Sequence, residues 1–160
     1  MNPVEAFLQS HNIIYTYHEH PAVYTCEQAE EYHHLMPGIA VKNLFLVDKK
    51  TWRKFLVILP AEKRANLKEF TKLLRASKLS FASADMLMQT MWLEPGSVSP
   101  FGLINNENKD VEVYIDKQVY DADIVNFHPN INTASLWLTH EMFQKYLEII
   151  ENKINIMGIL

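Results

Sequence analysis

The amino-acid sequence predicts an α+β protein, in which helices flank a curved, mostly antiparallel or mixed β-sheet with a barrel-like closure. Short apolar runs of strand length alternate with segments of helical periodicity that begin at cap residues. The chain has no internal repeat, low-complexity tract or linker-like composition. With 160 residues, it is expected to form a single domain spanning residues 1–160.

The N-terminal region is expected to form two helices around one strand. A helix begins at the cap residue Asn2, has proline in its first turn and ends near residue 12. Residues 13–18 are β-branched and aromatic, which favours a strand. A capping-box pattern at Thr25 predicts a second helix to about residue 35.

The next segment predicts a buried hairpin followed by a helix. Residues 40–47 and 55–59 are nearly continuous apolar runs joined by a basic turn. Asn66 is placed to cap the helix that follows. Its expected inward residues are Leu67, Phe70, Leu73 and Leu74, and its expected outer stripe is Lys68, Lys72 and Arg75.

The C-terminal half predicts further strands and helices around one loop rich in glycine and proline. The expected elements are a strand at 79–82, a helix capped by Ser83 over 86–91, strands at 111–115, 124–127 and 135–138, and a final helix capped by Thr139.

Composition excludes several classes of protein. No apolar run approaches the roughly 18 residues of a membrane helix, so no membrane partner is expected. The N-terminus lacks the basic and apolar regions of a secretory signal. The single cysteine, Cys26, excludes an internal disulfide and fits a reducing compartment, so the expected location is cytoplasmic.

The net charge of −4 conceals a basic tract. Ten of the 15 basic residues lie between Lys49 and Lys78, a segment that contains only two acids. Such a run is often only a solvated face, but this segregation also indicates a surface that meets polyanions.

The loop Pro95–Gly102 contains two of the four glycines and two of the seven prolines. Glycine permits positive φ and close approach, while proline fixes φ and removes a donor. The remaining N–H groups can therefore point at a bound oxygen or phosphate. The alternative is a tight turn between a helix and a strand.

Two polar residues stand out beside this loop. Lys42 lies within an apolar strand, where a lysine either extends its tip into water or faces a pocket. His128 lies in a polar, turn-rich segment between two strands, where a histidine is either structural or part of a site.

Other polar residues give weaker signals. Neither the histidines at 18 and 20 nor the pair at 33–34 is accompanied by the Cys, Asp or Glu residues of a zinc site. Cys26 has no identifiable base, and the serines of the loop lack the G-x-S-x-G context of a hydrolase. No metal and no cofactor is expected.

Three segments together resemble the signatures of the YbaK/prolyl-tRNA synthetase editing-domain family. They are Val41 to Leu46, Gly96 to Gly102 and His128 to Ala134, and the resemblance covers residues 1 to about 150. The His-Pro-x-x-Asn-Thr ending resembles the freestanding ProX (PrdX) branch, whose members hydrolyse alanine from mischarged prolyl tRNA.

The resemblance implies the editing-domain fold and a metal-free aminoacyl-tRNA hydrolase. Lys42 corresponds to the family's essential lysine, and Gly96 and Pro100 mark its G-x-x-x-P loop. The implied catalytic residues are Lys42, Gly96, Ser97, Val98 and Ser99. The implied acyl pocket comprises Pro100, Phe101, Gly102, His128, Asn132 and Thr133.

The implied partner is mischarged proline tRNA, with a transient contact to prolyl-tRNA synthetase. Lys49, Lys50, Arg53, Lys68, Lys72 and Arg75 are the residues expected to bind it. One alternative is a deacylase for cysteine or another small residue, and the other is a catalytically silent tRNA-binding or regulatory module.

Overall fold

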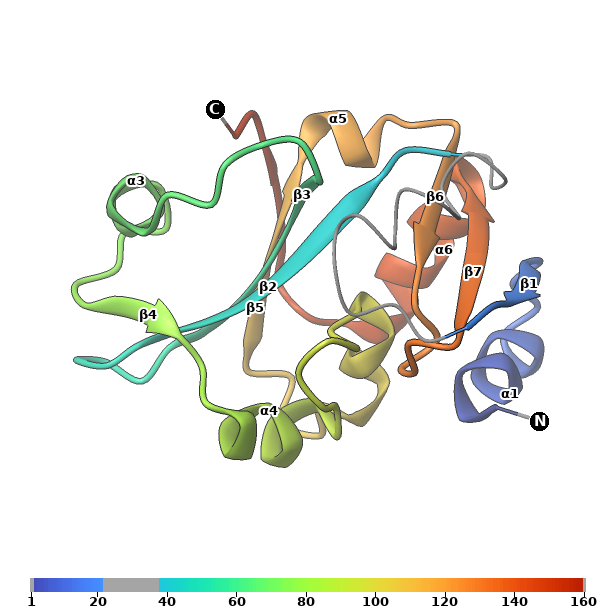
Figure 1. Cartoon of the computed structure of the whole chain (residues 1–160), viewed down its shortest axis with the longest axis horizontal. Coiled ribbons are helices and arrows are strands. Elements are labelled where there is room, and N and C mark those ends of the chain that lie inside the picture. Colours follow the sequence, from blue (N-terminus) through green and yellow to red (C-terminus); the bar gives the residue numbers. More distant parts are fainter. Residues whose placement is uncertain (1, 22–37, 160) are drawn as a thin grey trace.

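The computed structural model describes residues 2–21 and 38–159, so the helix predicted at residues 25–35, Cys26 and the histidines at 33–34 lie outside the described residues. The described elements form two sheets flanked by helices (Figure 1). The strands are β1 (Thr16–Glu19), β2 (Val41–Asp48), β3 (Lys54–Pro60), β4 (Leu79–Phe81), β5 (Val111–Asp116), β6 (Ile124–Phe127), β7 (Ala134–Thr139) and β8 (Ile154–Met157). The helices are α1 (Pro3–Ser10), α3 (Leu67–Leu73), α4 (Ala84–Met91), the 3₁₀ helix η1 (Pro100–Asn105), α5 (Lys117–Tyr120) and α6 (His140–Ile150).

Strand pairing confirms the α+β class and a mixed sheet. The three-stranded sheet has the order β1-β7-β6, and both of its pairings are antiparallel. The five-stranded sheet has the order β4-β2-β3-β5-β8. In it, β2 pairs antiparallel with β3 and β4, whereas β5 is parallel to both β3 and β8.

A parallel bridge between Ile39 and Val125 joins the two sheets into one curved surface. The Ile39 N–H donates to the Ile124 carbonyl at 3.2 Å. Gly38, with φ of +101°, lets the chain approach this closely, because a Cβ there would lie 2.8 Å from the Ile124 oxygen. The described strands stop short of a closed barrel, so the barrel-like closure is not confirmed.

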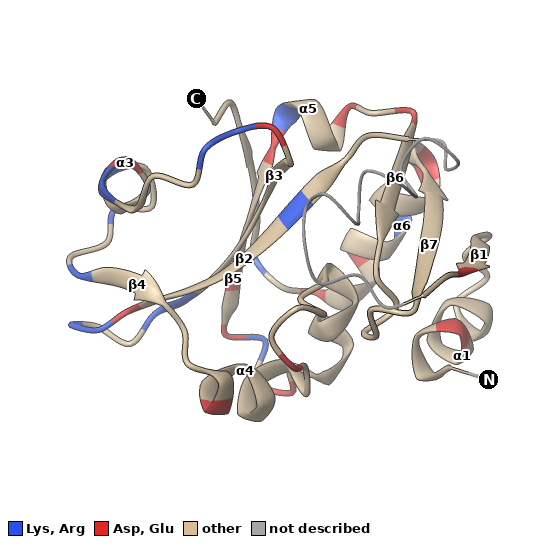
Figure 2. Ribbon diagram, in the orientation of Figure 1, with Lys and Arg blue, Asp and Glu red and all other residues tan. Residues whose placement is uncertain are grey.

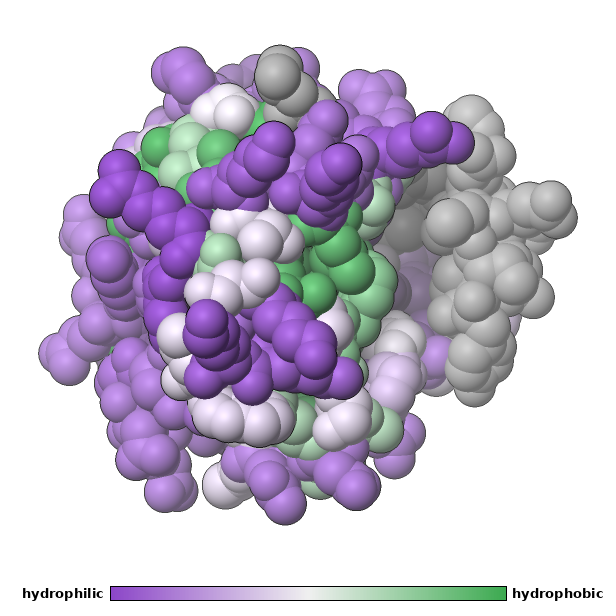
Figure 3. Space-filling view, turned by 90° about the vertical axis from the view of Figure 1, so that its left-hand side faces the viewer, coloured by the Kyte–Doolittle hydropathy of each residue, from purple (hydrophilic) through white to green (hydrophobic). Residues whose placement is uncertain are grey.

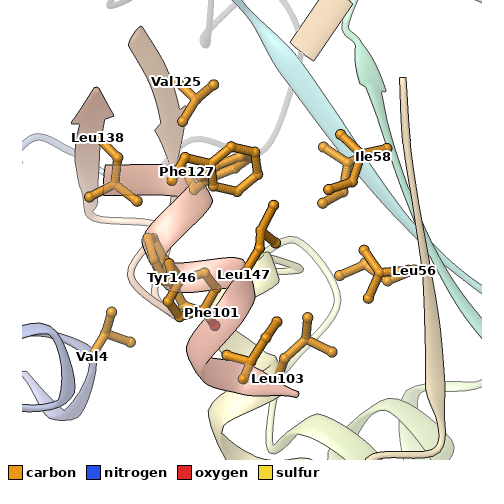
Figure 4. Packing of buried hydrophobic residues seen from close by; sticks show 14 of the residues in the cluster. Val4, Leu56, Ile58, Phe101, Leu103, Val125, Phe127, Leu138, Tyr146 and Leu147 are labelled. Carbon is orange, nitrogen blue, oxygen red and sulfur yellow. The ribbon is translucent and has the colours of Figure 1, made fainter. Parts of the chain in front are cut away.

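Apolar residues cover both sides of this surface. On the side that we call the inner face, β3 directs Leu56 and Ile58 toward Phe101, Leu103 and Leu147 (Figure 4). On the opposite side, the outer face, a smaller cluster lies under α3. Its buried members are Leu46, Phe55, Val57, Leu59, Phe70, Leu74, Tyr114 and Ile159. Successive residues of β2 and β3 therefore face different cores, which explains their continuous apolar runs.

Local sequence signals placed most helix starts correctly. The predicted caps accept hydrogen bonds from the first turns of their helices: Asn2 from Val4 N–H, Asn66 from Glu69 N–H, Ser83 from Met86 N–H and Thr139 from Met142 N–H. The predicted hairpin is also present, with Lys42 opposite Leu59 and Phe45 opposite Leu56.

Some details differ from the prediction. The first strand begins at Thr16 rather than at residue 13. Leu73 is 37% exposed instead of inward, because α3 ends there and the chain turns through Leu74. Arg75 has φ of +53° and lies beyond the helix, so it does not continue the stripe of Lys68 and Lys72.

Three short elements were not predicted: η1, α5 and β8. Each has six residues or fewer, which is too short for periodicity to show. The strand β8 also depends on a parallel partner, β5, that is distant in sequence. No helix in residues 2–21 and 38–159 is long and apolar enough to cross a membrane.

Candidate functional site

The outer face of the three-stranded sheet is polar. Strand pairing sets His18 opposite Ser135 and Asn126 opposite Trp137. Because side chains alternate along strands, these residues share one face, while Leu136, Val125 and Phe127 enter the inner core. His20 continues β1 on the same face, where its ring nitrogen Nε2 lies 3.0 Å from Ser135 Oγ.

Lys42 lies on this same outer face. It is opposite Leu59, which belongs to the outer cluster, while its neighbour Val41 packs against the inner core. It is the second residue of the long strand β2. The side chain is half-buried, and within the described chain it forms no hydrogen bond or ion pair.

The bridge between the two sheets aligns Lys42 with His128. The bridge pairs Ile39 with Val125, and the two strands run parallel from that point. Lys42 and His128 each lie three residues beyond it, on the side opposite the two bridging residues. The fold therefore places Lys42 and His128 on the same face, each at the same number of residues from the bridge. The two side chains form no hydrogen bond with each other.

His128 is fixed by its own turn. Its Nδ1 lies 3.0 Å from the Ala134 carbonyl, so in the neutral ring Nδ1 is the donor and Nε2 the acceptor. Burial lowers the pKa of His128, the hydrogen bond to Ala134 raises it, and the charge of His20 lowers it further. The net effect is a pKa below the ordinary value, which favours a neutral imidazole at pH 7.

The first half of the loop Pro95–Gly102 is accessible. Gly96 is exposed with φ of +91°, and a Cβ on it would meet no atom within 4 Å. The Ser97 N–H donates to the Glu94 carbonyl at 3.1 Å. In the described structure the N–H groups of Gly96, Val98 and Ser99 donate to no backbone carbonyl, and those of the exposed Gly96 and the half-buried Val98 remain available as donors.

The second half of the loop is buried and anchors the first. Tyr146 donates its hydroxyl to the Pro100 carbonyl at 2.6 Å, and burial raises the pKa of that phenol. Phe101 is fully buried, with ring centroids 5.9 Å from Phe127 and 5.2 Å from Tyr146. A Cβ on Gly102 would lie 2.6 Å from Leu93 Cδ1, so close packing requires glycine there.

Ser99 has a structural contact as well. Its hydroxyl oxygen caps η1 by accepting the Phe101 N–H at 3.1 Å, and the side chain has no exposed surface. Ser99, Pro100, Phe101 and Gly102 thus hold the loop in place through one capped N–H, one main-chain carbonyl and close packing. Whether these residues also contact an acyl group stays a prediction.

The segment from His128 to Thr133 lies against this anchor. Asn130, with φ of +66°, donates its side-chain N–H to the Phe101 carbonyl at 3.4 Å. Asn132 is half-buried and Thr133 exposed, and Thr133 lines a pocket of about 470 Å³ with Tyr17, Glu19, His20 and Ile131. The loop and this turn are thus brought together, and their joint role in one site stays a prediction.

Sequence reasoning missed three polar residues near the site: Asn43, His20 and Ser135. Asn43 points to the inner side, and its buried Oδ1 has no hydrogen-bond partner in the part of the chain that the structure describes. A second polar residue in an apolar strand was a usable signal for Asn43. The contact between His20 and Ser135 joins residues 115 apart in the sequence, so no local pattern could reveal it.

The basic tract divides into two groups. Arg53, Lys54 and Lys63 form ion pairs with Glu112, Asp110 and Asp116 of β5 and its flank. Arg53 binds both oxygens of Glu112 at 2.9 Å, which raises the pKa of the guanidinium. The other seven are exposed: one is Arg64, in the loop before α3, and the remaining six, which we call the basic surface, are Lys49, Lys50, Lys68, Lys72, Arg75 and Lys78.

The basic surface occupies the end of the molecule formed by α3, β4 and the β2–β3 turn (Figure 2). Seen from that side, hydrophilic side chains surround a smaller apolar area (Figure 3). Trp52, 59% exposed, lies at the tip of the same turn. Arg53, although predicted to bind tRNA, is already engaged by Glu112, so the exposed lysines are better placed for phosphate contacts.

The described residues contain no group of three or more His, Cys, Asp or Glu side chains that could hold a metal ion. What the site offers instead is one lysine, one neutral imidazole and several backbone donors. These groups can bind an anionic or ester oxygen and accept a proton or hydrogen bond.

Solved structures share this fold. A structure described as that of a candidate trans-editing enzyme for prolyl tRNA synthetase matches with a TM-score of 0.72 and 18% identity, over 100% of this chain and 99% of that chain. This chain therefore has the fold of that structure.

Sequence comparison then gives the family. The model of the aminoacyl-tRNA editing domain matches residues 20–146, and this chain belongs to that family. The prolyl-tRNA editing protein ProX of Acetoanaerobium sticklandii is 39% identical, over 91% of this chain and 88% of its own. A prolyl-tRNA synthetase associated domain-containing protein of Danio rerio is 31% identical, over 91% and 79%. The resemblance seen in the three sequence segments, including that to the ProX branch, is confirmed.

Proposed function

We propose that this protein is a trans-acting deacylase that hydrolyses the ester of alanine mischarged onto proline tRNA. The observation that carries the proposal is the alignment of Lys42 and His128 on one face by the Ile39–Val125 bridge. The family supports an aminoacyl-tRNA substrate, and the 39% identical relative, named as a prolyl-tRNA editing protein, supports proline tRNA.

An aminoacyl ester is already activated, so the chain needs to hold it still and to stabilise the developing oxyanion. The N–H groups of Gly96 and Val98 are suitable donors for that oxyanion. Lys42 binds the 3′ end through its phosphate or its ester carbonyl. His128 offers Nε2 as an acceptor for the attacking water or the substrate amine.

The adjacent hydroxyl of the terminal ribose completes the positioning of the water, so no protein nucleophile is required. Ser97 and Ser99 are poor nucleophiles here, since both are buried and Ser99 already caps η1. We expect activity to persist after treatment with a chelator.

Selectivity for alanine has a physical basis. A synthetase site built for proline rejects the smaller alanine weakly, because a missing methylene is worth only about 1–3 kcal/mol. A second site that admits alanine and is too small for the proline ring supplies the missing discrimination. The buried Phe101 and Pro100 give such a site a rigid support.

The basic surface is proposed to bind the tRNA body. From Lys42 to Asp48, β2 spans about 20 Å, since a strand rises roughly 3.3 Å per residue. A single-stranded 3′ end that enters at Lys42 therefore places the adjoining duplex near Lys49 and Lys50. Lys68 and Lys72 on α3 extend this surface.

The test measures ester hydrolysis on one proline tRNA charged separately with alanine, cysteine, serine and proline. We expect alanine to be released fastest and proline to be spared. Faster release of cysteine would assign the alternative substrate. Binding of alanyl-tRNA without a shortened lifetime would instead identify a silent binding module.

We expect the Lys42→Ala variant to be folded and to lose deacylation. The matched control is Lys117→Ala, an exposed lysine on the short helix α5. A Lys42→Ala variant that keeps more than about a tenth of the wild-type rate, a loss under roughly 1.4 kcal/mol, would remove Lys42 from the mechanism.

A further inference from the structure

His20 and Ser135 form a hydrogen-bonded pair on the outer face, beside the proposed site. His20 Nε2 lies 3.0 Å from Ser135 Oγ, and His20 Nδ1 lies 2.8 Å from the Pro21 carbonyl. The His20 main chain is also fixed, because its N–H donates to the Thr133 carbonyl at 2.9 Å. Ser135 is only 6% exposed, so the pair is shielded from water on one side.

These two contacts indicate which nitrogen of the neutral His20 ring carries the hydrogen. The Pro21 carbonyl can only accept, so Nδ1 carries the hydrogen in the neutral ring. Nε2 is then an acceptor, and the Ser135 hydroxyl donates to it. The arrangement therefore fixes the plane of the His20 ring.

The fixed ring lies against His128. The two ring centroids are 6.3 Å apart and the rings are inclined by 58°. His128 is held in the same way, by a main-chain carbonyl at Nδ1. In both imidazoles, Nδ1 is thus within hydrogen-bond distance of a main-chain carbonyl. The Nε2 atom of His128 forms no hydrogen bond with any described residue.

We propose that His20, fixed by Ser135 and Pro21, is a positioning residue for His128 in the deacylation reaction. This inference rests on the proposed function. It assigns His20 no contact with the ester: His20 limits the orientation of the His128 ring. Ser135 acts one step further away, by holding His20.

The charges that share the face are few. Among the described residues, the titratable or charged groups on this face near His128 are His18 and His20 of the β1 segment and Lys42 of β2. His20 is the member whose charge lowers the pKa of His128. Removing the His20 imidazole should therefore raise the pKa of His128.

Three variants separate positioning from simple structural support. His20→Gln keeps an amide oxygen near the place of Nε2, so it can still accept from Ser135 without titrating. His20→Ala and Ser135→Ala break the pair from either side. The matched control is His18→Ala, since His18 is an exposed neighbour on the same strand whose ring stacks on Trp137 and lies 6.4 Å from the His20 ring but does not hold His20 by a hydrogen bond.

Single-turnover deacylation of alanyl-tRNA should show a fall of at least about tenfold in the maximal rate for His20→Ala and Ser135→Ala, because a displaced catalytic group costs rate rather than affinity. The half-saturating concentration should stay within about twofold. His20→Gln should keep the rate within about threefold, and His18→Ala should match wild type. A wild-type maximal rate in both alanine variants would overturn the proposal. So would a change in the half-saturating concentration alone, with the maximal rate unchanged.

A second measurement is independent of activity. The ring resonances of His128, followed by NMR from pH 4 to 9, should report a higher pKa in His20→Gln than in wild type. An unchanged titration of His128 would overturn the coupling even if the variants lose rate. If the wild-type protein hydrolyses no ester while His20→Gln shifts the titration, the proposed function fails and the coupling stands.

Discussion

Replacing Asp48 should most clearly test what stabilises the fold, as distinct from the chemistry of the proposed site. This carboxylate at the end of β2 has no exposed surface. It accepts the N–H groups of Lys50 at 3.0 Å, Ser77 at 2.9 Å and Lys78 at 3.0 Å. It therefore ties the β2–β3 turn to the segment before β4, and both carry lysines of the basic surface.

The magnitude of the effect follows from these contacts. In Asp48→Asn one carboxylate oxygen becomes an NH₂ group, which cannot accept from the N–H groups that face it. A hydrogen bond to a charged group contributes about 1.5–3 kcal/mol, and a buried donor left without a partner costs about 1–3 kcal/mol. We expect a loss of about 3 kcal/mol in the free energy of unfolding. For a chain of this size, that loss lowers Tm by roughly 6–12 °C.

The pH dependence supplies a second, signed prediction. Burial alone would raise the pKa of Asp48, but the three backbone donors and the Thr51 hydroxyl lower it well below its ordinary value. A group whose folded pKa is depressed stabilises the protein fully above its unfolded pKa, near 3.9, and loses that effect as the pH falls through the folded value. The difference between wild type and Asp48→Asn should therefore be constant from pH 7 to about 5 and should narrow in more acidic solution.

The assay is urea denaturation at a series of pH values, with the exposed Asp123→Asn as control. The reasoning is refuted if Asp48→Asn unfolds within about 0.5 kcal/mol of wild type, or if the difference persists unchanged at pH 3.

Two further predictions concern the loop and the basic surface. Gly96→Val should lower the deacylation rate by more than about a hundredfold, because a β-branched residue resists a φ of +91° and fills the open space above the loop, while Ser97→Ala should stay within about tenfold. The opposite ranking, with Ser97→Ala inactive and Gly96→Val active, would indicate a serine nucleophile. Mass spectrometry of quenched reactions would then detect the acyl-enzyme. Reversing the charges of Lys68 and Lys72 should weaken tRNA binding and flatten its salt dependence without affecting alanyl-adenosine, and equal damage to both substrates would contradict a role in binding the tRNA body.

Local chemistry explains which parts of the fold could be predicted from the sequence. Each predicted cap depends on a side chain and a main-chain N–H two or three residues away, as at Asn66 and Ser83. The β2–β3 hairpin was predictable for the same reason, since its strands are neighbours in sequence. By contrast, β8 is a strand only because β5 offers a parallel partner, and β5 is about forty residues away.

The same distinction applies to the site. The sequence singled out Lys42 and His128 as unusual residues, each in its own segment. Their alignment depends on the bridge at Ile39 and Val125, which no local pattern predicts. Arg53 shows the reverse case: it was expected to meet tRNA as a member of a basic tract, and this stays a prediction, but the sequence could not show its partner Glu112, which lies in a strand reached only in the folded chain.

A polar site on a sheet needs a place where strands stop pairing, and this fold provides one. Beyond the bridge, β2 pairs with β3 and β4, whereas β6 pairs with β7. The segments that meet at the bridge therefore no longer pair with each other. Lys42 and His128 lie at this level, both on the outer face of their strands. Burial of Phe101 and Phe127 on the inner face holds both strands from behind. The apolar core and the polar face are thus two sides of the same strands, and a change in the core that moves β6 relative to β2 should alter the site before it unfolds the protein.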